Sequence, residues 1–220
     1  MATPPIVPWT EDGTGGAVEE ASDLLLRGEV VAHPTETVYG LAGAASDPRG
    51  YAGLLRVKGG TGARAFLLLF DTRERLAGTL GELPPGGETL ARSFWPGPLT
   101  LLFPAAGGLP LWWSGPDGDV AARVTSHPFC HAVVGRLGGP VLSTSANRTG
   151  GSSLESAEAI AGAFDSAEVG LVVDGGRIAG LPSTLLRWTG EGWAVLREGP
   201  IPGASLARSL AGGGDAFRST

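Results

Sequence analysis

The sequence has 220 residues, of which 42% are hydrophobic, so it can form one domain with a sizeable core. Its formal net charge of −6 argues against a protein whose whole surface binds nucleic acid, and its single cysteine, Cys130, excludes an internal disulfide and a thiolate metal site. Without a membrane-length apolar run or a leader-like start, we expect a soluble cytoplasmic protein with no membrane partner.

The first predicted elements lead into a polar stretch. Residues 1–16 are rich in Pro, Gly and Thr, and we expect them to form a flexible N-terminal arm. Apolar residues at helical spacing predict a helix over 17–27, with Gly28 after its end. A buried strand is predicted over 29–32, and it runs into residues 33–42, where two threonine hydroxyls flank a carboxylate.

Helices and strands follow one another without strict alternation along the rest of the chain. Helices are predicted over 47–57, 71–80, 87–94, 127–137 and 154–164. Strands are predicted over 65–70, 99–103, 119–125, 140–142 and 169–173, and a hairpin over 183–188 and 193–196. This order indicates an α/β (α+β) fold with a twisted, mixed parallel and antiparallel sheet flanked by helices. We assign residues 17–202 to a single domain and expect 203–220 to be a flexible C-terminal tail.

Four polar segments each end a predicted strand or helix, and together they suit an anionic ligand. They are residues 35–37, 58–64, 143–147 and 182–184. Glycines let the backbone approach a phosphate, Lys and Arg neutralise it, and hydroxyls donate hydrogen bonds to it. Taken singly, each segment is also explained by a hydroxyl-capped turn or a plain loop. From these residue types alone, a ligand site and a set of turns remain alternatives.

Other kinds of site find little support in the sequence. His127 and His131 have the spacing of metal ligands on a helix, but no Glu adjoins them, so we expect no protein-bound metal. The Gly-x-Ser-x-Gly motif of acyl-enzyme chemistry is absent, and the segment after Lys58 lacks the spacing of a Walker phosphate loop.

Eight segments resemble, in order, the YrdC/Sua5 family, the threonylcarbamoyl-AMP synthases of tRNA N6-threonylcarbamoyladenosine (t6A) biosynthesis. They are residues 34–41, 58–59, 94–100, 122–128, 139–147, 174–176, 182–184 and 196–199. The resemblance implies a YrdC-like domain with a concave cationic cleft. It also implies a nucleotidyltransferase that condenses threonine, bicarbonate and ATP to threonylcarbamoyl-adenylate and pyrophosphate with Mg²⁺.

The resemblance assigns roles to individual residues. The implied threonine contacts are Thr35, Thr37, Arg123, Ser143 and Ser183, with Arg123 on the substrate carboxylate. The implied ATP contacts are Lys58, Ser145, Asn147, Ser153 and Arg197. The implied mechanism has no protein nucleophile: Lys58, Arg197 and Mg²⁺ are the catalytic groups, acting by positioning and charge stabilisation. tRNA or the downstream threonylcarbamoyl transferase complex is the further partner implied.

Three positions depart from the family pattern. Gly60 stands where the family has an arginine on the nucleotide phosphates, and we hypothesise that Arg64 reaches the same anion, as an ATP contact. Loss of one such contact costs about 1.5–3 kcal/mol, so we expect weakened activity. Leu69 replaces a histidine of some members, and Asp119 replaces a hydroxyl residue. These departures motivate the alternatives of a diverged member that binds nucleotide or double-stranded RNA, or of an enzyme that makes a different carbamoyl-adenylate.

Overall fold

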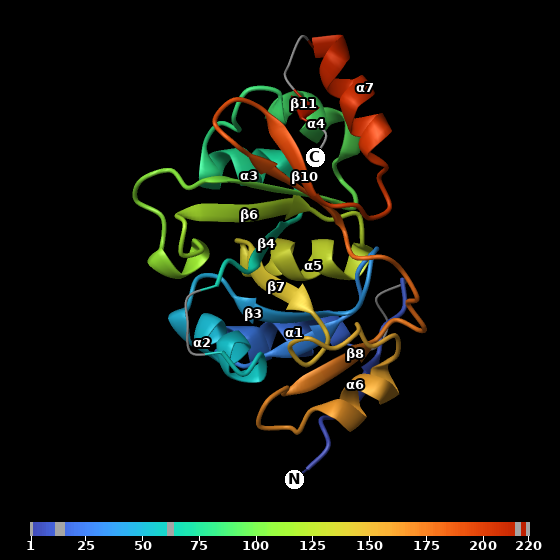
Figure 1. Ribbon diagram of the computed structural model, residues 1–220. Coiled ribbons are helices and arrows are strands. Elements are labelled where there is room, and N and C mark those ends of the chain that lie inside the picture. Colours follow the sequence, from blue (N-terminus) through green and yellow to red (C-terminus); the bar gives the residue numbers. More distant parts are fainter. Residues whose placement is uncertain (1, 12–15, 61–63, 214–216, 219–220) are drawn as a thin grey trace.

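The computed structural model describes residues 2–11, 16–60, 64–213 and 217–218 (Figure 1). Its strands are β1 (Ile6–Pro8), β2 (Val31–His33), β3 (Gly40–Ala44), β4 (Leu67–Phe70), β5 (Leu99–Pro104), β6 (Asp119–Val124), β7 (Val141–Ser145), β8 (Leu171–Asp174), β9 (Thr184–Trp188), β10 (Trp193–Arg197) and β11 (Phe217–Arg218). Its helices are α1 (Ala17–Leu26), α2 (Pro48–Val57), α3 (Arg73–Leu80), α4 (Gly87–Phe94), α5 (Pro128–Leu137), α6 (Ala157–Ala163), α7 (Gly203–Gly213) and the 3₁₀ helix η1 (Leu111–Trp113). Within these ranges, no helix combines the length and apolar character needed to cross a membrane.

The described strands form one sheet in the order β1-β8-β2-β3-β7-β4-β6-β5-β9-β10-β11. The sheet contains parallel pairs, such as β4 with β6, and antiparallel pairs, such as β3 with β7. The predicted mixed sheet flanked by helices is confirmed. Strand β4 lies between β7 and β6, the interior position that its run of leucines indicates.

Apolar side chains form two clusters, one on each face of the sheet. Helices α1 and α5 cover one face, where Leu25 and Val134 pack in the same cluster as Val141 of β7 (Figure 1). Leu142, the next residue of β7, belongs to the other cluster with residues of α2, α4, α6 and α7. Because side chains alternate along a strand, Ser143 faces the same side as Val141. This alternation decides which polar residues can meet.

Helix α2 has the signals at both ends that its sequence predicts. The Asp47 carboxylate accepts a hydrogen bond from the Arg49 N–H at 2.8 Å, and Pro48 is the first helical residue. Lys58 follows the last turn, and Gly59 then adopts a φ of 61°, a conformation that glycine takes at little cost. The helix end therefore fixes where Lys58 leaves α2.

The prediction of an N-terminal arm was wrong for part of residues 1–16. Ile6–Pro8 is strand β1, which pairs in parallel with residues 172–174 of β8 at the edge of the sheet. Three residues are too few to show strand alternation, and a proline is tolerated at a sheet edge, so only the partner strand reveals this element. Residues 12–15 of the predicted arm lie outside the described residues.

The prediction of a flexible C-terminal tail was wrong for residues 203–213, which form α7. Leu206 and Leu210 lie four residues apart and are fully buried in the cluster that α4 also joins. The surrounding residues are mostly Gly, Ala and Ser, so two leucines were too weak a signal for a helix. Tertiary packing on the rest of the domain stabilises it.

One strand was not predicted, and another is longer than predicted. Residues 33–42 were expected to form a loop, but Gly40–Ala44 is strand β3, whose short sequence of Gly, Leu and Ala has low strand propensity. Strand β7 continues through the polar triplet and ends at Ser145. The hydroxyls of this triplet therefore stand on a regular strand and not on a turn.

Candidate functional site

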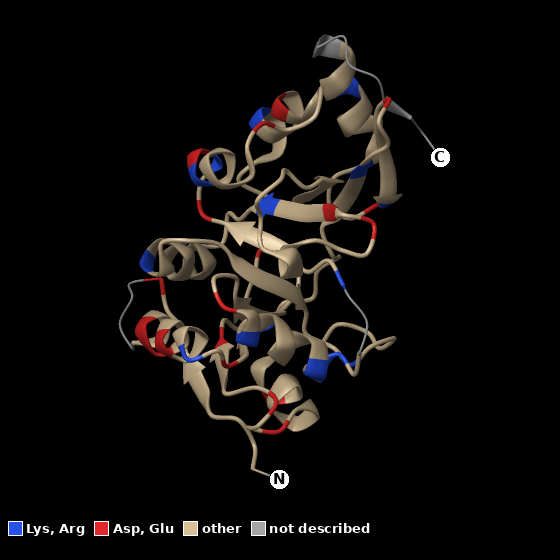
Figure 2. Cartoon of the chain, turned by 90° about the vertical axis from the view of Figure 1, so that its left-hand side faces the viewer, with Lys and Arg blue, Asp and Glu red and all other residues tan. Residues whose placement is uncertain are grey.

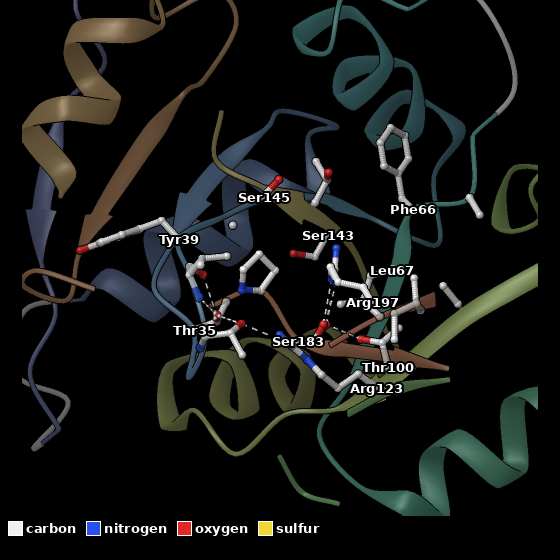
Figure 3. A pocket seen from close by; sticks show the side chains of 18 residues that line it. Thr35, Tyr39, Phe66, Leu67, Thr100, Arg123, Ser143, Ser145, Ser183 and Arg197 are labelled. Atoms are coloured by element: carbon white, nitrogen blue, oxygen red, sulfur yellow. Dashed lines mark hydrogen bonds between the residues drawn. The ribbon is translucent and has the colours of Figure 1, made fainter. Parts of the chain in front are cut away.

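A cavity of about 240 Å³ opens on the sheet face to which Ser143 points (Figure 3). Its polar lining consists of Thr35, Thr37, Thr100, Arg123, Ser143, Thr144, Ser145, Ser183 and Arg197. Its other lining residues are Val38, Tyr39, Gly40, Ala65, Phe66, Leu67, Ala121, Pro182 and Leu185. All five predicted threonine contacts and two predicted ATP contacts thus come together in one space.

Strand register explains why residues far apart in the sequence share this cavity. Ser143 of β7 lies opposite Leu67 of β4, which lies opposite Ala121 of β6. Arg123 follows Ala121 by two residues and so points to the same side of the sheet. Thr100 of β5, the next strand, also lines the cavity.

The Thr35 hydroxyl organises the loop before β3. It accepts hydrogen bonds from the N–H groups of Thr37 at 3.1 Å and Val38 at 3.2 Å, and it donates to the Val38 carbonyl at 2.6 Å. The sequence left a hydroxyl-capped turn and a ligand site as alternatives for this segment. The structure has the turn, and its Thr35 also lines the cavity, so the turn forms part of the site.

The Thr37 hydroxyl lies between Thr35 and Arg123. The Thr35 hydroxyl gives its one proton to the Val38 carbonyl, and its two lone pairs accept the N–H groups of Thr37 and Val38, so it does not take up the proton of the Thr37 hydroxyl, whose oxygen is 3.0 Å away. Thr37 Oγ1 accepts from Arg123 Nη1 at 3.2 Å. The Thr37 hydroxyl therefore keeps its proton and one lone pair for a ligand in the cavity.

Arg123 and Glu36 form a buried ion pair beside the cavity. Their side chains are 3% and 13% exposed, and Nε of Arg123 lies 3.5 Å from Oε1 of Glu36. The other oxygen of Glu36 accepts from the Thr125 hydroxyl at 2.9 Å. Nε of Arg123 faces Glu36, and Nη1 donates to Thr37. The outer edge of the guanidinium, formed by its remaining N–H groups, is therefore the part left to bind a ligand carboxylate.

A second guanidinium reaches the cavity from the end of β10. Arg197 donates through Nε to the Ser183 carbonyl at 3.0 Å and through Nη2 to the Ser183 hydroxyl at 3.2 Å. Burial and the nearby charge of Arg123 lower the pKa of Arg197. Figure 3 shows Arg197 hydrogen-bonded to Ser183, while Arg123 reaches into the same cavity and its hydrogen bond runs to Thr37. An anion between the two guanidiniums would offset their repulsion.

Lys58 lies next to the cavity, at the end of α2. Its Nζ donates to the Ser145 carbonyl at 2.8 Å, to the Asn147 carbonyl at 2.9 Å and to Asn147 Oδ1 at 2.6 Å. All three ammonium protons are thus used to hold the residues that follow β7. Burial, and secondly the charge of Arg64, lowers the pKa of Lys58 to about 8.

Arg64 and Ser153 are not among the described residues that line the cavity. Arg64 is exposed, but a Cβ built on Gly60 would lie 4.0 Å from its Nε, so its side chain stands beside the position where the family carries arginine. Ser153 is half-buried before α6. Residues 61–63 of the predicted phosphate segment lie outside the described residues.

Leu69 and Asp119, the other two residues that depart from the family pattern, both make contacts that explain their side chains. Leu69 is fully buried on β4, opposite Arg123 of β6, in the cluster under α1 and α5. Asp119, at the start of β6, pairs with Arg187 at 2.8 Å. Neither side chain lines the described cavity, and the charge of Asp119 is compensated.

Three residues of this site were not among the predicted contacts: Thr100 and Thr144, which line the cavity, and Glu36 beside it. Thr100 lines the cavity, and its hydroxyl lies 2.8 Å from that of Ser183. It is the one polar side chain of β5, and this isolated hydroxyl in a buried apolar strand was the available signal. Glu36 was visible between two threonines, but nothing in the sequence placed it against Arg123.

The cavity offers hydroxyls and guanidinium groups and no lining carboxylate among the described residues. Those residues also contain no group of three or more His, Cys, Asp or Glu side chains that could hold a metal ion. His127 caps α5 by accepting the Phe129 N–H at 3.2 Å. Magnesium prefers one or two carboxylates plus phosphate oxygens, so the described cavity lining by itself does not supply the ligands of a magnesium site.

Known proteins are similar to this chain in sequence and fold. The Sua5/YciO/YrdC family model, described as telomere recombination, matches residues 23–199. A threonylcarbamoyl-AMP synthase of Alkalilimnicola ehrlichii is 41% identical over 133 residues, which cover 60% of this chain and 69% of the relative. Another from Pyrococcus abyssi is 32% identical over 183 residues, which cover 83% of this chain and 54% of the relative.

Solved structures are also similar to this chain. P. abyssi Sua5 complexed with L-threonine has a TM-score of 0.84 at 29% identity, covering 98% of this chain and 62% of that one. E. coli YciO, at 20% identity, shares the fold with a TM-score of 0.80, covering 94% of this chain and 100% of its own. The chain thus spans less than two thirds of the solved Sua5 chain. Since the family model extends over the cavity-lining residues from Thr35 to Arg197, the chain belongs to the Sua5/YciO/YrdC family.

Proposed function

We propose that the chain is a threonylcarbamoyl-AMP synthase, which condenses threonine, bicarbonate and ATP for t6A modification of tRNA in the cytoplasm. The observation that carries this proposal is the convergence of Arg123, Arg197 and the hydroxyls of Thr37, Ser143 and Ser183 on one cavity. An amino acid presents a carboxylate and an amine, and this lining offers cations for the first and acceptors for the second. The cavity, about 240 Å³, lies below the range of about 300–1,000 Å³ typical of larger ligands.

The threonine carboxylate binds, in this proposal, to the outer edge of Arg123, with Arg197 as the second cation. The Thr37 hydroxyl, which accepts from Arg123, uses its second lone pair to accept a hydrogen bond from the α-amine. Glu36 compensates the charge of Arg123 from the side away from the ligand. The negative charge of the ligand carboxylate is then balanced by the positive charge of Arg197. Binding therefore orients the amine relative to two fixed guanidinium groups.

The nucleotide is placed next to this cavity, where Lys58, Ser145 and Asn147 form a hydrogen-bonded unit. Arg64, beside Gly60, supplies further positive charge to the phosphates. The nucleotide enters as magnesium–ATP, and the ion neutralises phosphate charge as part of the substrate. Ser153 is the most remote of the proposed ATP contacts.

The reaction needs no protein nucleophile. Bicarbonate takes up a proton and loses water to give CO₂, and the threonine amine attacks this CO₂ and loses a proton, so a carbamate forms with net release of one water. A carbamate oxygen then attacks the α-phosphorus of ATP. A new P–O bond forms, the bond to the β-phosphate bridge breaks, and pyrophosphate leaves. Lys58 and Arg197 position the phosphates and stabilise developing charge, the main contributions that a protein makes to such transfers.

Pyrophosphate release tests this proposal directly. The protein, incubated with magnesium–ATP, should release pyrophosphate only when both threonine and bicarbonate are present, with threonylcarbamoyl-adenylate detected by mass. A matched reaction with 2-aminobutyrate, which lacks the hydroxyl, reports selectivity. Absence of threonine-dependent release across a range of Mg²⁺ concentrations would contradict the synthase. Release with a different amino acid would identify the alternative carbamoyl-adenylate.

Because Gly60 and Arg64 lie side by side, we predict that an arginine at position 60 can replace Arg64. Arg64→Ala is expected to raise the Kd for ATP about tenfold, because it removes a charge-assisted contact worth about 1.5–3 kcal/mol. Adding Gly60→Arg should restore binding, since the backbone of Gly60 is not in the left-handed region and Arg64 Nε is the nearest atom to the new Cβ. Isothermal titration measures both values. A normal Kd for Arg64→Ala, with a tenfold gain in activity for Gly60→Arg alone, would show that Arg64 does not replace the family arginine.

The lowered pKa of Lys58 yields a pH prediction. The Kd for ATP, measured without threonine, should rise as the pH passes about 8, by up to about tenfold per unit, because only the protonated amine attracts phosphate. Lys58→Met should bind ATP weakly with no such step. Stability should change oppositely: between about 8 and the ordinary value of 10.5 the unfolded chain holds the extra proton, so the Lys58 contribution favours folding as pH rises.

Direct RNA binding is a weaker candidate. In the view of Figure 2, basic and acidic residues are interspersed, and exposed arginines such as Arg148 and Arg177 pair with Glu168 and Glu155. We therefore propose tRNA, or the downstream threonylcarbamoyl transferase complex, as the destination of the product and not as a tightly held ligand. A gel shift at low salt, where phosphate contacts are strongest, should show no retained double-stranded RNA.

A further inference from the structure

His33, at the end of β2, links the cavity to the interior under α5. Its ring is 3% exposed and stacks near Phe129 at a centroid distance of 6.4 Å. Nδ1 lies 3.2 Å from the Pro34 carbonyl oxygen and 3.3 Å from Cys130 Sγ. Nε2 lies 3.2 Å from the hydroxyl of Ser143, which lines the cavity. The imidazole thus connects to a site residue without lining the cavity itself.

Glycine at position 40 makes this contact possible. His33 lies opposite Gly40 in the β2–β3 pair, and Ser143 is on β7, on the other side of β3. The imidazole must therefore cross a whole strand, with neighbouring strands about 4.8 Å apart. A Cβ at Gly40 would lie 2.6 Å from His33 Nε2 and 2.9 Å from Ser143 Oγ, so any side chain there would separate the two groups.

The partners of Nδ1 decide which ring nitrogen carries the proton. Burial lowers the pKa of His33 to about 3, so the ring is neutral and has one N–H. The Pro34 carbonyl can only accept, and it also receives the Cys130 thiol at 3.2 Å, so the proton belongs on Nδ1. Nε2 then has only a lone pair, and Ser143 must donate its hydroxyl proton to it.

We propose that His33 is a positioning residue that fixes the direction in which Ser143 hydrogen-bonds. Ser143 gives its proton to His33 and meets the ligand only as an acceptor. Ser143 therefore selects a ligand group that donates hydrogen bonds, such as an amine or a carbamate N–H, and disfavours a group that only accepts. That this ligand is threonine rests on the proposed function, whereas the hydrogen-bond direction does not.

The ring proton of the unmodified protein is the first test. Nitrogen-15 NMR correlates ring nitrogens with ring carbon-bound protons and separates the two neutral tautomers from the charged ring. The sequence has three histidines, and the signals lost in His33→Phe assign His33. We expect the Nδ1–H tautomer throughout the range from pH 5 to pH 8. The Nε2–H tautomer, or a charged ring, would overturn the proposal whatever ligand the site binds.

A double-mutant cycle is the second test. His33→Phe keeps an aromatic ring but removes the acceptor, and it should raise the Kd for threonine about three- to tenfold. Ser143→Ala should raise it about tenfold, and adding His33→Phe to Ser143→Ala should change it by less than about twofold. Equal effects of His33→Phe with and without the Ser143 hydroxyl would overturn the proposal, because they would show a general packing role.

Two further variants sharpen the cycle. His33→Gln offers an amide oxygen as an acceptor near the place of Nε2 and should recover most of the lost affinity. Cys130→Ala perturbs the same buried cluster but leaves the contact from Nε2 to Ser143, and it should keep the Kd of the unmodified protein. If the unmodified protein binds no threonine, the proposed function fails, while the tautomer measurement still decides the role of His33.

Discussion

Arg123→Met is expected to abolish threonine-dependent pyrophosphate release and to destabilise the fold. The methionine leaves the Glu36 carboxylate, 13% exposed, without its cation, and breaking a buried pair in this way costs about 3–5 kcal/mol. Thr37 also loses the hydrogen bond from Nη1. Activity should fall by more than about a hundredfold, because the carboxylate contact and its orientation are both lost. Chemical denaturation and the pyrophosphate assay measure the two effects.

The double variant Glu36→Gln with Arg123→Met separates the two effects. It removes the uncompensated charge and should regain most of the lost stability, yet it should remain inactive because no guanidinium meets the substrate. Arg177→Met is the matched control, since its pair with Glu155 is 76% and 47% exposed and should contribute less than about 1 kcal/mol. Recovery of activity in the double variant would exclude Arg123 from the substrate site.

Lys58→Met is expected to reduce pyrophosphate release about a hundred- to a thousandfold, with the loss in the ATP-dependent step. The substitution removes a cation and three hydrogen bonds, leaving the Ser145 carbonyl and both Asn147 oxygens with fewer donors. Unsatisfied buried acceptors cost about 1–3 kcal/mol each when water cannot replace the donor, so moderate destabilisation should accompany the kinetic effect. Initial rates at varied ATP, together with thermal denaturation, measure both.

Threonine binding provides the contrast for this variant. Lys58 does not line the cavity, so Lys58→Met should leave the Kd for threonine within about threefold of the unmodified value. Arg56→Met is the matched control, because Arg56 is exposed on the same helix and carries the same charge. An equal loss of activity in Arg56→Met would attribute the effect to net charge and would remove Lys58 from the proposed mechanism.

Much of the fold was predictable because its signals are local. The cap of α2 at Asp47, the apolar run of β4 and the hairpin of β9 and β10 depend on neighbouring residues only. Strand β1 and helix α7 were missed because their backbone or side chains are satisfied by partners distant in the sequence. Short elements of this kind are not stable in isolation, so no local sequence pattern predicts them.

The sequence by itself determined the residue types of the site, since hydroxyls, cations and glycines stand at the ends of predicted strands. It also established the order of the eight segments that the family shares, and so the chemistry to expect. The tertiary structure alone decided which groups meet. Alternation and register placed Ser143, Leu67 and Arg123 on one face of the sheet, and packing set Glu36 against Arg123 and His33 across Gly40. The direction of a hydroxyl's hydrogen bond depends on such neighbours, because the hydroxyl has one proton and donates it to the neighbour that can only accept.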